Sequence, residues 1–136
     1  MLDTDVLVAA LRSSRGASRQ LLLGALDRRF ELLLSVPLML EYEAVLTRPE
    51  QLAACALTSE DVGRVLDDLA SVARPVALSF RWRPKLPDLN DDMVLETAVN
   101  GNANAIVTFN HRDFEGTAQN FDCAVILPRE ALERVG

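Results

Sequence analysis

The chain of 136 residues is predicted to adopt an α/β fold, a three-layer α/β/α sandwich with a mostly parallel central sheet of about five strands. Short apolar runs of strand length alternate along it with longer segments of helical period. Strands separated by helices imply βαβ crossovers, which give parallel pairing and helices on both faces of the sheet. Because no repeat, low-complexity stretch or linker interrupts this alternation, residues 1–136 are predicted to form one domain.

The strands are expected where short apolar runs stand alone, at residues 1–3, 31–34, 76–78, 105–107 and 124–126. Only two residues precede Asp3, so the first strand is either very short or begins upstream of Met1. Ligands of such folds bind outside the carboxyl ends of the strands. Asp3 and Asp113 follow strand candidates and are therefore expected at that edge.

The helices are expected between the strands, at about residues 5–11, 17–28, 37–47, 50–57, 59–73, 91–101 and 129–135. Two of them have clear start signals. Ser35 is followed by Val36 and Pro37, which places a proline in the first turn. Thr58 precedes a helix whose first turn carries two acids.

Composition narrows the function classes. The net charge of −6 argues against a protein that coats nucleic acid with a basic face, but it does not exclude a nuclease, because a bound cation changes the local sign of a site. No apolar run is long enough for a membrane span and no signal-peptide pattern opens the chain, so a cytoplasmic protein is expected. His111 is the only histidine and no phosphate-binding glycine motif occurs, which leaves little support for a nucleophilic triad or a nucleotide loop.

Carboxylates at the start of apolar segments carry the strongest chemical signal. Asp3 and Asp5 lead into the run 6–11, and Asp91 lies on the apolar face of its predicted helix. Acids in such places are costly to ionise unless a cation meets them. Periodicity alone leaves Glu41 and Glu43 tied, because they flank the apolar face of their helix almost symmetrically. Plain structural roles also stay open: Asp5 as a helix cap, and Asp88 or Asn90 as the cap of the helix that contains Asp91.

Carboxylate oxygens at one sheet edge suit Mg²⁺ or Mn²⁺, which bind oxygen ligands together with substrate phosphates. Such ions activate water and stabilise the charge that develops in phosphodiester hydrolysis.

Four segments in order resemble the PIN-domain family, and within it the VapC-like ribonucleases that are toxin components of bacterial toxin–antitoxin systems. The first is residues 2–8, an apolar strand with Asp, Thr and a third polar residue. The second is residues 35–49, where the acid six positions after the serine is Glu41. The third is residues 88–98, and the fourth is residues 105–114, close to a Val-Thr-x-Asn-x-x-Asp-Phe signature.

The resemblance implies a metal-dependent endoribonuclease whose catalytic and metal-binding acids are Asp3, Glu41, Asp91 and Asp113. It implies supporting roles for Asp5, Asp88, Thr108 and Asn110. Arg112 is a further candidate for contact with substrate phosphates. It also implies Mg²⁺ or Mn²⁺ as cofactor, RNA as substrate, a homodimer, inhibition by a cognate antitoxin protein, and no membrane association.

Two other functions compete with this interpretation. A catalytically inactive PIN fold would serve as an RNA- or protein-binding module. A phosphatase of the haloacid-dehalogenase type would use Asp3 as nucleophile and Asp5 as acid/base, but the only lysine, Lys85, lies in a poor position for that chemistry.

Overall fold

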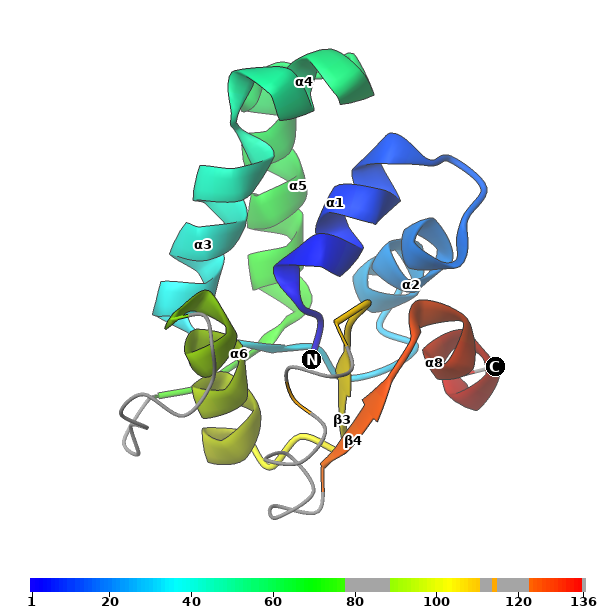
Figure 1. The fold of residues 1–136 in the computed structure, drawn as a ribbon, viewed down its shortest axis with the longest axis vertical. Helices are drawn as coiled ribbons and strands as arrows, with labels where there is room; N and C mark the ends of the chain where they lie inside the picture. The colour runs from blue at the N-terminus through cyan, green and yellow to red at the C-terminus, as the bar shows by residue number, and fades with distance from the viewer. Residues whose placement is uncertain (78–88, 111–113, 115–122, 136) are drawn as a thin grey trace.

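A computed structural model describes residues 1–77, 89–110, 114 and 123–135, and residues 89–93 by their backbone only (Figure 1). The elements in this part of the chain are, in order, α1 (Thr4–Arg12), α2 (Ala17–Leu26), β1 (Leu33–Leu34), α3 (Val36–Leu46), α4 (Pro49–Cys55), α5 (Ser59–Val72), β2 (Arg74–Pro75), α6 (Leu89–Asn100), β3 (Ala105–Val107), β4 (Ala124–Ile126) and α8 (Pro128–Val135). Helices and strands alternate as the sequence predicts. No helix in these ranges has both the length and the apolar character that crossing a bilayer requires.

The strands are short and all described pairings are parallel. β1 pairs with β2, β3 pairs with β4, and the predicted first strand is reduced to a single bridge between Leu2 and Val107. The described residues therefore form two separate two-stranded pieces and one bridge, and the predicted sheet of about five strands is not confirmed. The bridge holds the start of the chain beside β3, because Asp3 N–H donates to the Val107 carbonyl and Val107 N–H donates to the Met1 carbonyl, both at 2.9 Å.

The strand expected at 76–78 instead begins at Arg74, and residue 78 lies outside the described residues. Pro75 looks like a strand breaker in the sequence. The structure accommodates it because the backbone N–H groups on either side make the bonds: Arg74 N–H donates to the Leu32 carbonyl at 2.8 Å, and Val76 N–H donates to the Leu34 carbonyl at 2.9 Å. No N–H is needed at position 75.

Helix positions agree with the sequence to within one to two residues at most ends. Ser35 caps α3 and accepts a bond from Leu38 N–H, with Pro37 in the first turn. Thr58 and Asp61 form a reciprocal capping box at the start of α5. α4 ends two residues earlier than expected, because Ala56 adopts a left-handed conformation (φ 56°) that stops the helix.

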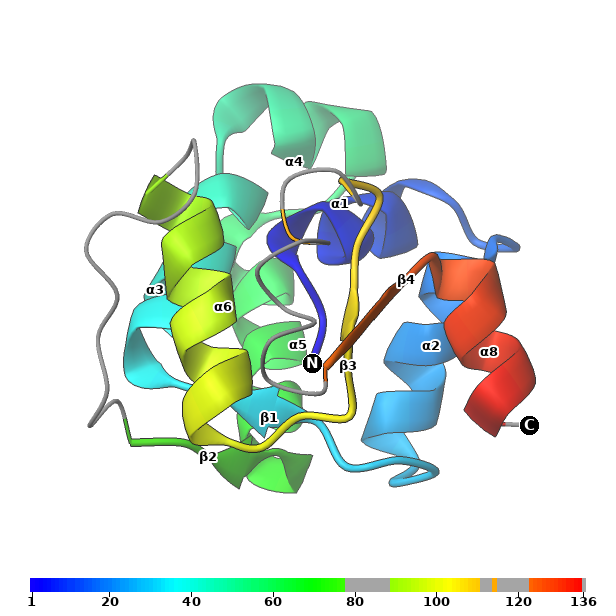
Figure 2. The same cartoon turned by 60° about the horizontal axis from the view of Figure 1, so that its bottom comes forward.

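The strands lie between two groups of helices (Figure 2). α3, α5 and α6 lie on one side, and α2 and α8 lie on the other, which is the layered arrangement of an α/β fold. The core fills the space between the layers and includes fully buried residues from five elements or connections: Leu2, Tyr42, Leu69, Leu95 and Ile106.

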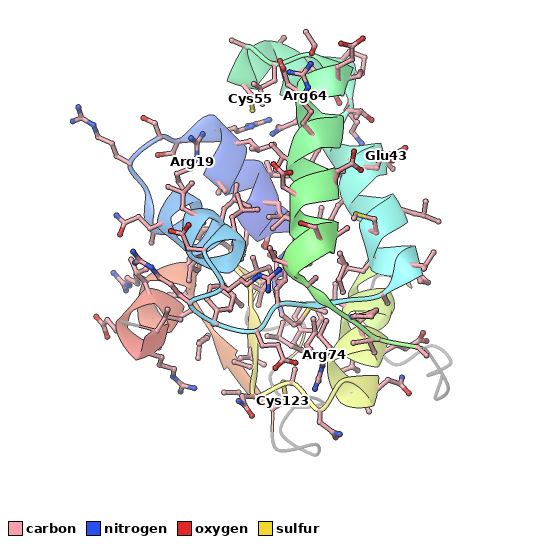
Figure 3. The ribbon with its side chains drawn as sticks, turned by 180° about the vertical axis from the view of Figure 1, so that it is seen from behind. Arg19, Glu43, Cys55, Arg64, Arg74 and Cys123 are labelled. Atoms are coloured by element: carbon pink, nitrogen blue, oxygen red, sulfur yellow. The ribbon has the colours of Figure 1, made fainter. Side chains whose placement is uncertain are left out.

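The end of α6 approaches β1 and β2 very closely at Gly101. A Cβ atom there would lie 2.7 Å from Leu33 Cδ1 and 2.9 Å from Val76 Cγ2. Arg74, which is labelled above Cys123 in Figure 3, donates to the Gly101 carbonyl and forms an exposed ion pair with Glu31 at 2.7 Å. This position therefore needs a glycine for packing and not for backbone conformation.

Candidate active site

The candidate site lies where β3 ends and α1 begins. Figures 1 and 2 show the carboxyl ends of β3 and β4 at the same level of the molecule as the first turns of α1 and α6. This is the edge at which parallel α/β folds bind their ligands. Two of the four predicted catalytic positions lie where elements start there: Asp3 directly precedes α1, and residue 91 is in the first turn of α6.

Asp3 is held in the interior at the start of α1. Its side chain is only 5% exposed, and its Oδ1 accepts a 2.8 Å bond from Thr4 N–H, so that Asp3 is the N-cap of the helix. The interpretation of Asp5 as the cap is therefore wrong. The cap falls two residues earlier because the bridge between Leu2 and Val107 holds Asp3 in extended backbone.

Thr108 joins Asp3 to the end of β3. It is completely buried, and its Oγ1 donates to Asp3 Oδ2 at 2.7 Å while accepting from Asn110 N–H at 3.0 Å. The same Oγ1 lies 3.4 Å from Asp5 Oδ2. A single hydroxyl thus bridges the two aspartates across more than a hundred residues of chain.

Asp5 has an asymmetric environment. Its Oδ2 accepts bonds from Phe109 N–H at 3.1 Å and from Asn110 Nδ2 at 3.2 Å, in addition to its contact with Thr108. Its Oδ1 is buried and has no hydrogen-bond partner among the described residues. Burial, and secondly the neighbouring charge of Asp3, raise the pKa of Asp5 to about 6. A buried carboxylate oxygen without a donor is the kind of atom that a cation or water satisfies.

Glu41 and Glu43 are no longer equivalent in the structure. Glu41 is half-buried on α3, whereas Glu43 is exposed. Between them Tyr42 is fully buried and donates to the Leu2 carbonyl at 2.5 Å, one residue before Asp3. Burial, together with the charge of Asp3, raises the pKa of the Tyr42 hydroxyl. α3 is therefore attached directly to the backbone that carries Asp3.

Tyr42 was not among the predicted site residues. The available signal was the only tyrosine of the chain on the apolar face of a helix, where a buried hydroxyl needs a partner. A second positioning contact joins α3 to α6, since Ser35 Oγ and Thr97 Oγ1 lie 2.6 Å apart in the interior. Glu96, next to Thr97, is only 8% exposed.

α6 begins at Leu89, so residue 91 lies in its first turn, and Asn90 lies inside the helix and does not cap it. Position 91 precedes the buried residues Val94, Leu95 and Ala98 by three, four and seven residues and shares their helical face. The side chain of Asp91 and the whole of Asp88, Arg112 and Asp113 lie outside the described residues.

The carboxylate oxygens of this site are suitable ligands for a hard cation. Asp3 and Asp5 share a donor, and the buried Oδ1 of Asp5 has capacity for a ligand. The described residues contain no group of three acids, cysteines or histidines placed to hold a metal ion. Glu41 therefore does not form such a group with Asp3 and Asp5 within the described part of the chain. Asp3 and Asp5 lie close enough for one hydroxyl to contact both, so their negative charges repel each other and a bound cation would relieve that repulsion.

The family model of the PIN domain matches residues 1–112. Searches of curated proteins and of solved structures gave no significant match. The chain therefore belongs to the PIN-domain family, whose members are generally nucleases that bind divalent metal ions. The matched segment ends one residue before Asp113.

Proposed function

We propose that this PIN-domain protein is an Mg²⁺- or Mn²⁺-dependent endoribonuclease. The observation that carries the proposal is the pair of Asp3, which is buried, and Asp5, which is half-buried, at the end of β3. Thr108 bridges the two side chains, and one oxygen of Asp5 has no hydrogen-bond partner among the described residues. Two acids placed side by side and largely out of solvent oppose folding unless a ligand or proton compensates them. The cost is explained if the pair exists to bind a cation.

Asp3 and Asp5 would hold the metal ion, with Glu41, Asp91 and Asp113 as the further acids of the family pattern. A bound ion supplies a water of lowered pKa and neutralises charge on the phosphodiester. The residues around it orient the acids. Thr108 fixes Asp3 Oδ2, and the backbone of Phe109 and the side chain of Asn110 fix Asp5 Oδ2.

The test is cleavage of a pool of structured and single-stranded RNA with Mg²⁺, Mn²⁺ or EDTA. We expect wild-type protein to cleave only with metal, and Asp3→Asn and Asp91→Asn to lose at least about a hundredfold in rate, as expected when an acid that positions the reacting groups is removed. Glu41→Gln and Glu43→Gln form a matched pair two residues apart on α3. Only the first should impair cleavage.

The outcomes separate the alternatives. Metal-independent RNA binding without cleavage, unchanged in Asp91→Asn, would support a binding module. Phosphatase turnover that depends on Asp5 but not on Glu41 would support the haloacid-dehalogenase interpretation. Equal loss in Glu41→Gln and Glu43→Gln would contradict the assignment of Glu41.

We further propose that the enzyme is the toxin of a toxin–antitoxin pair and acts as a homodimer. The family resemblance supports the toxin role, and a strip of exposed apolar side chains on α3 supports the dimer: Val36 is 73% and Leu40 is 60% exposed. Induced expression should arrest growth, and co-expression of the adjacent gene should relieve it. Light scattering should give twice the monomer mass for wild type and the monomer mass for Leu40→Glu. Growth that continues under expression of an active nuclease would contradict the toxin role.

A further inference from the structure

A second feature at the same edge is a cleft of about 360 Å³ beside the aspartate pair. It lies between the carboxyl half of α1, the start of α2, the end of β3 and the turn from β4 to α8. Its lining residues are Ala9, Ser13, Gly16, Ala17, Ser18, Phe109, Leu127, Pro128 and Arg129. The volume is at the small end of the range for ligand pockets, about 300–1,000 Å³, and suits one flat ring system.

Phe109 connects this cleft to the candidate active site. Its backbone N–H donates to Asp5 Oδ2, and its side chain is 50% exposed. It is one of four large apolar residues exposed in the described part of the chain, and the other three lie on α2 and α3. A phenyl ring whose backbone is bonded to Asp5 and whose side chain lines the cleft half open to solvent gives up burial that would favour folding. Stacking on a ligand would recover it.

The charges of the cleft fit an anionic chain that carries flat groups. None of its lining residues is an acid, although the protein as a whole has a net charge of −6. Arg129, at its rim, is exposed and makes no ion pair with any described residue. A guanidinium in this position matches a phosphate, and the ring of Phe109 matches a base.

We infer that the cleft receives an unpaired nucleobase of the RNA, stacked on Phe109, with an adjoining phosphate on Arg129. This inference rests on the proposed function and adds to it a binding place for one base of the RNA outside the aspartate pair. Because Phe109 is bonded to Asp5, the stacked base belongs to a nucleotide next to the phosphodiester held at the aspartate pair. Bases in a duplex are already stacked on each other and would not enter.

The experiment measures binding and cleavage separately, with a short single-stranded RNA that contains one 2-aminopurine, whose fluorescence reports stacking. In EDTA we expect Phe109→Ala to weaken binding about tenfold and to abolish the fluorescence change, whereas Phe109→Tyr should retain both. Arg129→Gln should lower the salt dependence of binding by about one phosphate contact. Leu23→Ala, at a leucine of equal exposure (51%) on α2, is the control.

Each outcome decides the inference. Phe109→Ala that is folded by circular dichroism and binds single-stranded RNA like wild type overturns it, as does equal affinity for duplex and single strand. Loss of antitoxin binding in Phe109→Ala with RNA binding intact also overturns it, because the cleft would then hold a protein side chain. If wild type binds through Phe109 but never cleaves with metal, the inference stands and the nuclease proposal fails. If wild type cleaves RNA with metal and Phe109→Ala changes neither binding nor cleavage, the nuclease proposal stands and the inference about the cleft fails.

Discussion

Asp5 shows how a single side chain at this site balances folding against ligand binding. Three donors converge on its Oδ2, and no described group reaches its Oδ1. An asparagine fits the same place. Its Oδ1 atom would occupy the position of Asp5 Oδ2 and accept the bonds made there, and its amide nitrogen would occupy the position of Asp5 Oδ1. The charge of Asp5 is therefore not needed for the fold of the metal-free protein.

The pH dependence of stability follows from the pKa of Asp5. The folded protein binds the proton more tightly than the unfolded chain, because the pKa is raised from 3.8 to about 6. This contribution is fully present below the unfolded value and is lost as the pH rises through 6. In EDTA, Asp5→Asn should raise the melting temperature at about pH 7.5, and the gain should shrink as the pH falls toward 4. Thermal unfolding across this range measures it. The exposed Asp67→Asn is the control, and a gain that does not vary with pH contradicts the argument.

Thr108 tests the bridge between the two aspartates. Thr108→Val keeps the shape but leaves Asp3 Oδ2 without its short bond and Asn110 N–H without an acceptor. We expect a loss of about 1–3 kcal/mol in the free energy of unfolding, the usual cost of buried polar groups left unsatisfied. Thr108→Ser retains the hydroxyl and should lose clearly less. Urea denaturation measures both variants, and equal losses would show that packing, not the hydroxyl, matters here.

The sequence indicated much of this site but not how it is connected. Asp3 and Asp5 could be selected because they are acids at the start of an apolar run, whereas Thr108 and Asn110 were selected through the resemblance to the PIN-domain family. Their mutual bonds could not be foreseen, because they join residues more than a hundred positions apart. The role of Tyr42 was missed for the same reason, since its partner is the backbone carbonyl of Leu2, 40 positions earlier in the chain.

Among the secondary-structure elements, the helices were predictable and the sheet was not. Period and capping are local properties, so the helix from Ser59 begins at the predicted residue. β3 and β4 have the predicted bounds, whereas β1 and β2 are shorter than the predicted strands at 31–34 and 76–78, because strand length depends on partners elsewhere in the chain. The strand predicted at 76–78 was placed too late in the chain because a proline lacks a backbone N–H. Only the register of the pairing shows that position 75 needs no N–H donor.

Replacement of glycine by alanine is expected to have opposite effects on stability at Gly101 and at Gly63. At Gly101 a Cβ would meet Leu33 and Val76 at 2.7 and 2.9 Å, so Gly101→Ala should destabilise the protein by about 1–3 kcal/mol. At Gly63, within α5, nothing lies within 4 Å, and Gly63→Ala should stabilise by about 0.5–1 kcal/mol through helix propensity. Chemical denaturation of the two variants measures the pair. If both stabilise, α6 is not packed as closely against β1 and β2 as the distances indicate.

At the scale of the whole molecule, folding and metal binding should be coupled. The chain carries a net charge of −6 and places a buried and a half-buried aspartate side by side, so the metal-free fold bears a repulsion that a divalent cation would remove. A ligand that binds only the folded state stabilises it by about 2.7 kcal/mol at a hundred times its dissociation constant. Because Asn also caps helices, Asp3→Asn keeps the start of α1 while removing one charge of the pair.

We therefore expect Mn²⁺ to raise the melting temperature of wild type by several degrees, and not that of Asp3→Asn, at constant ionic strength. In EDTA the variant should be as stable as wild type or more stable, because the repulsion with Asp5 is relieved. Glu43→Gln removes a charge from the exposed face of α3 and should respond to Mn²⁺ like wild type. An equal rise in all three proteins would mean that the ion acts on the surface charge at large. A rise confined to the proteins that retain Asp3 would locate the coupling at the end of β3, where the fold brings the two aspartates together.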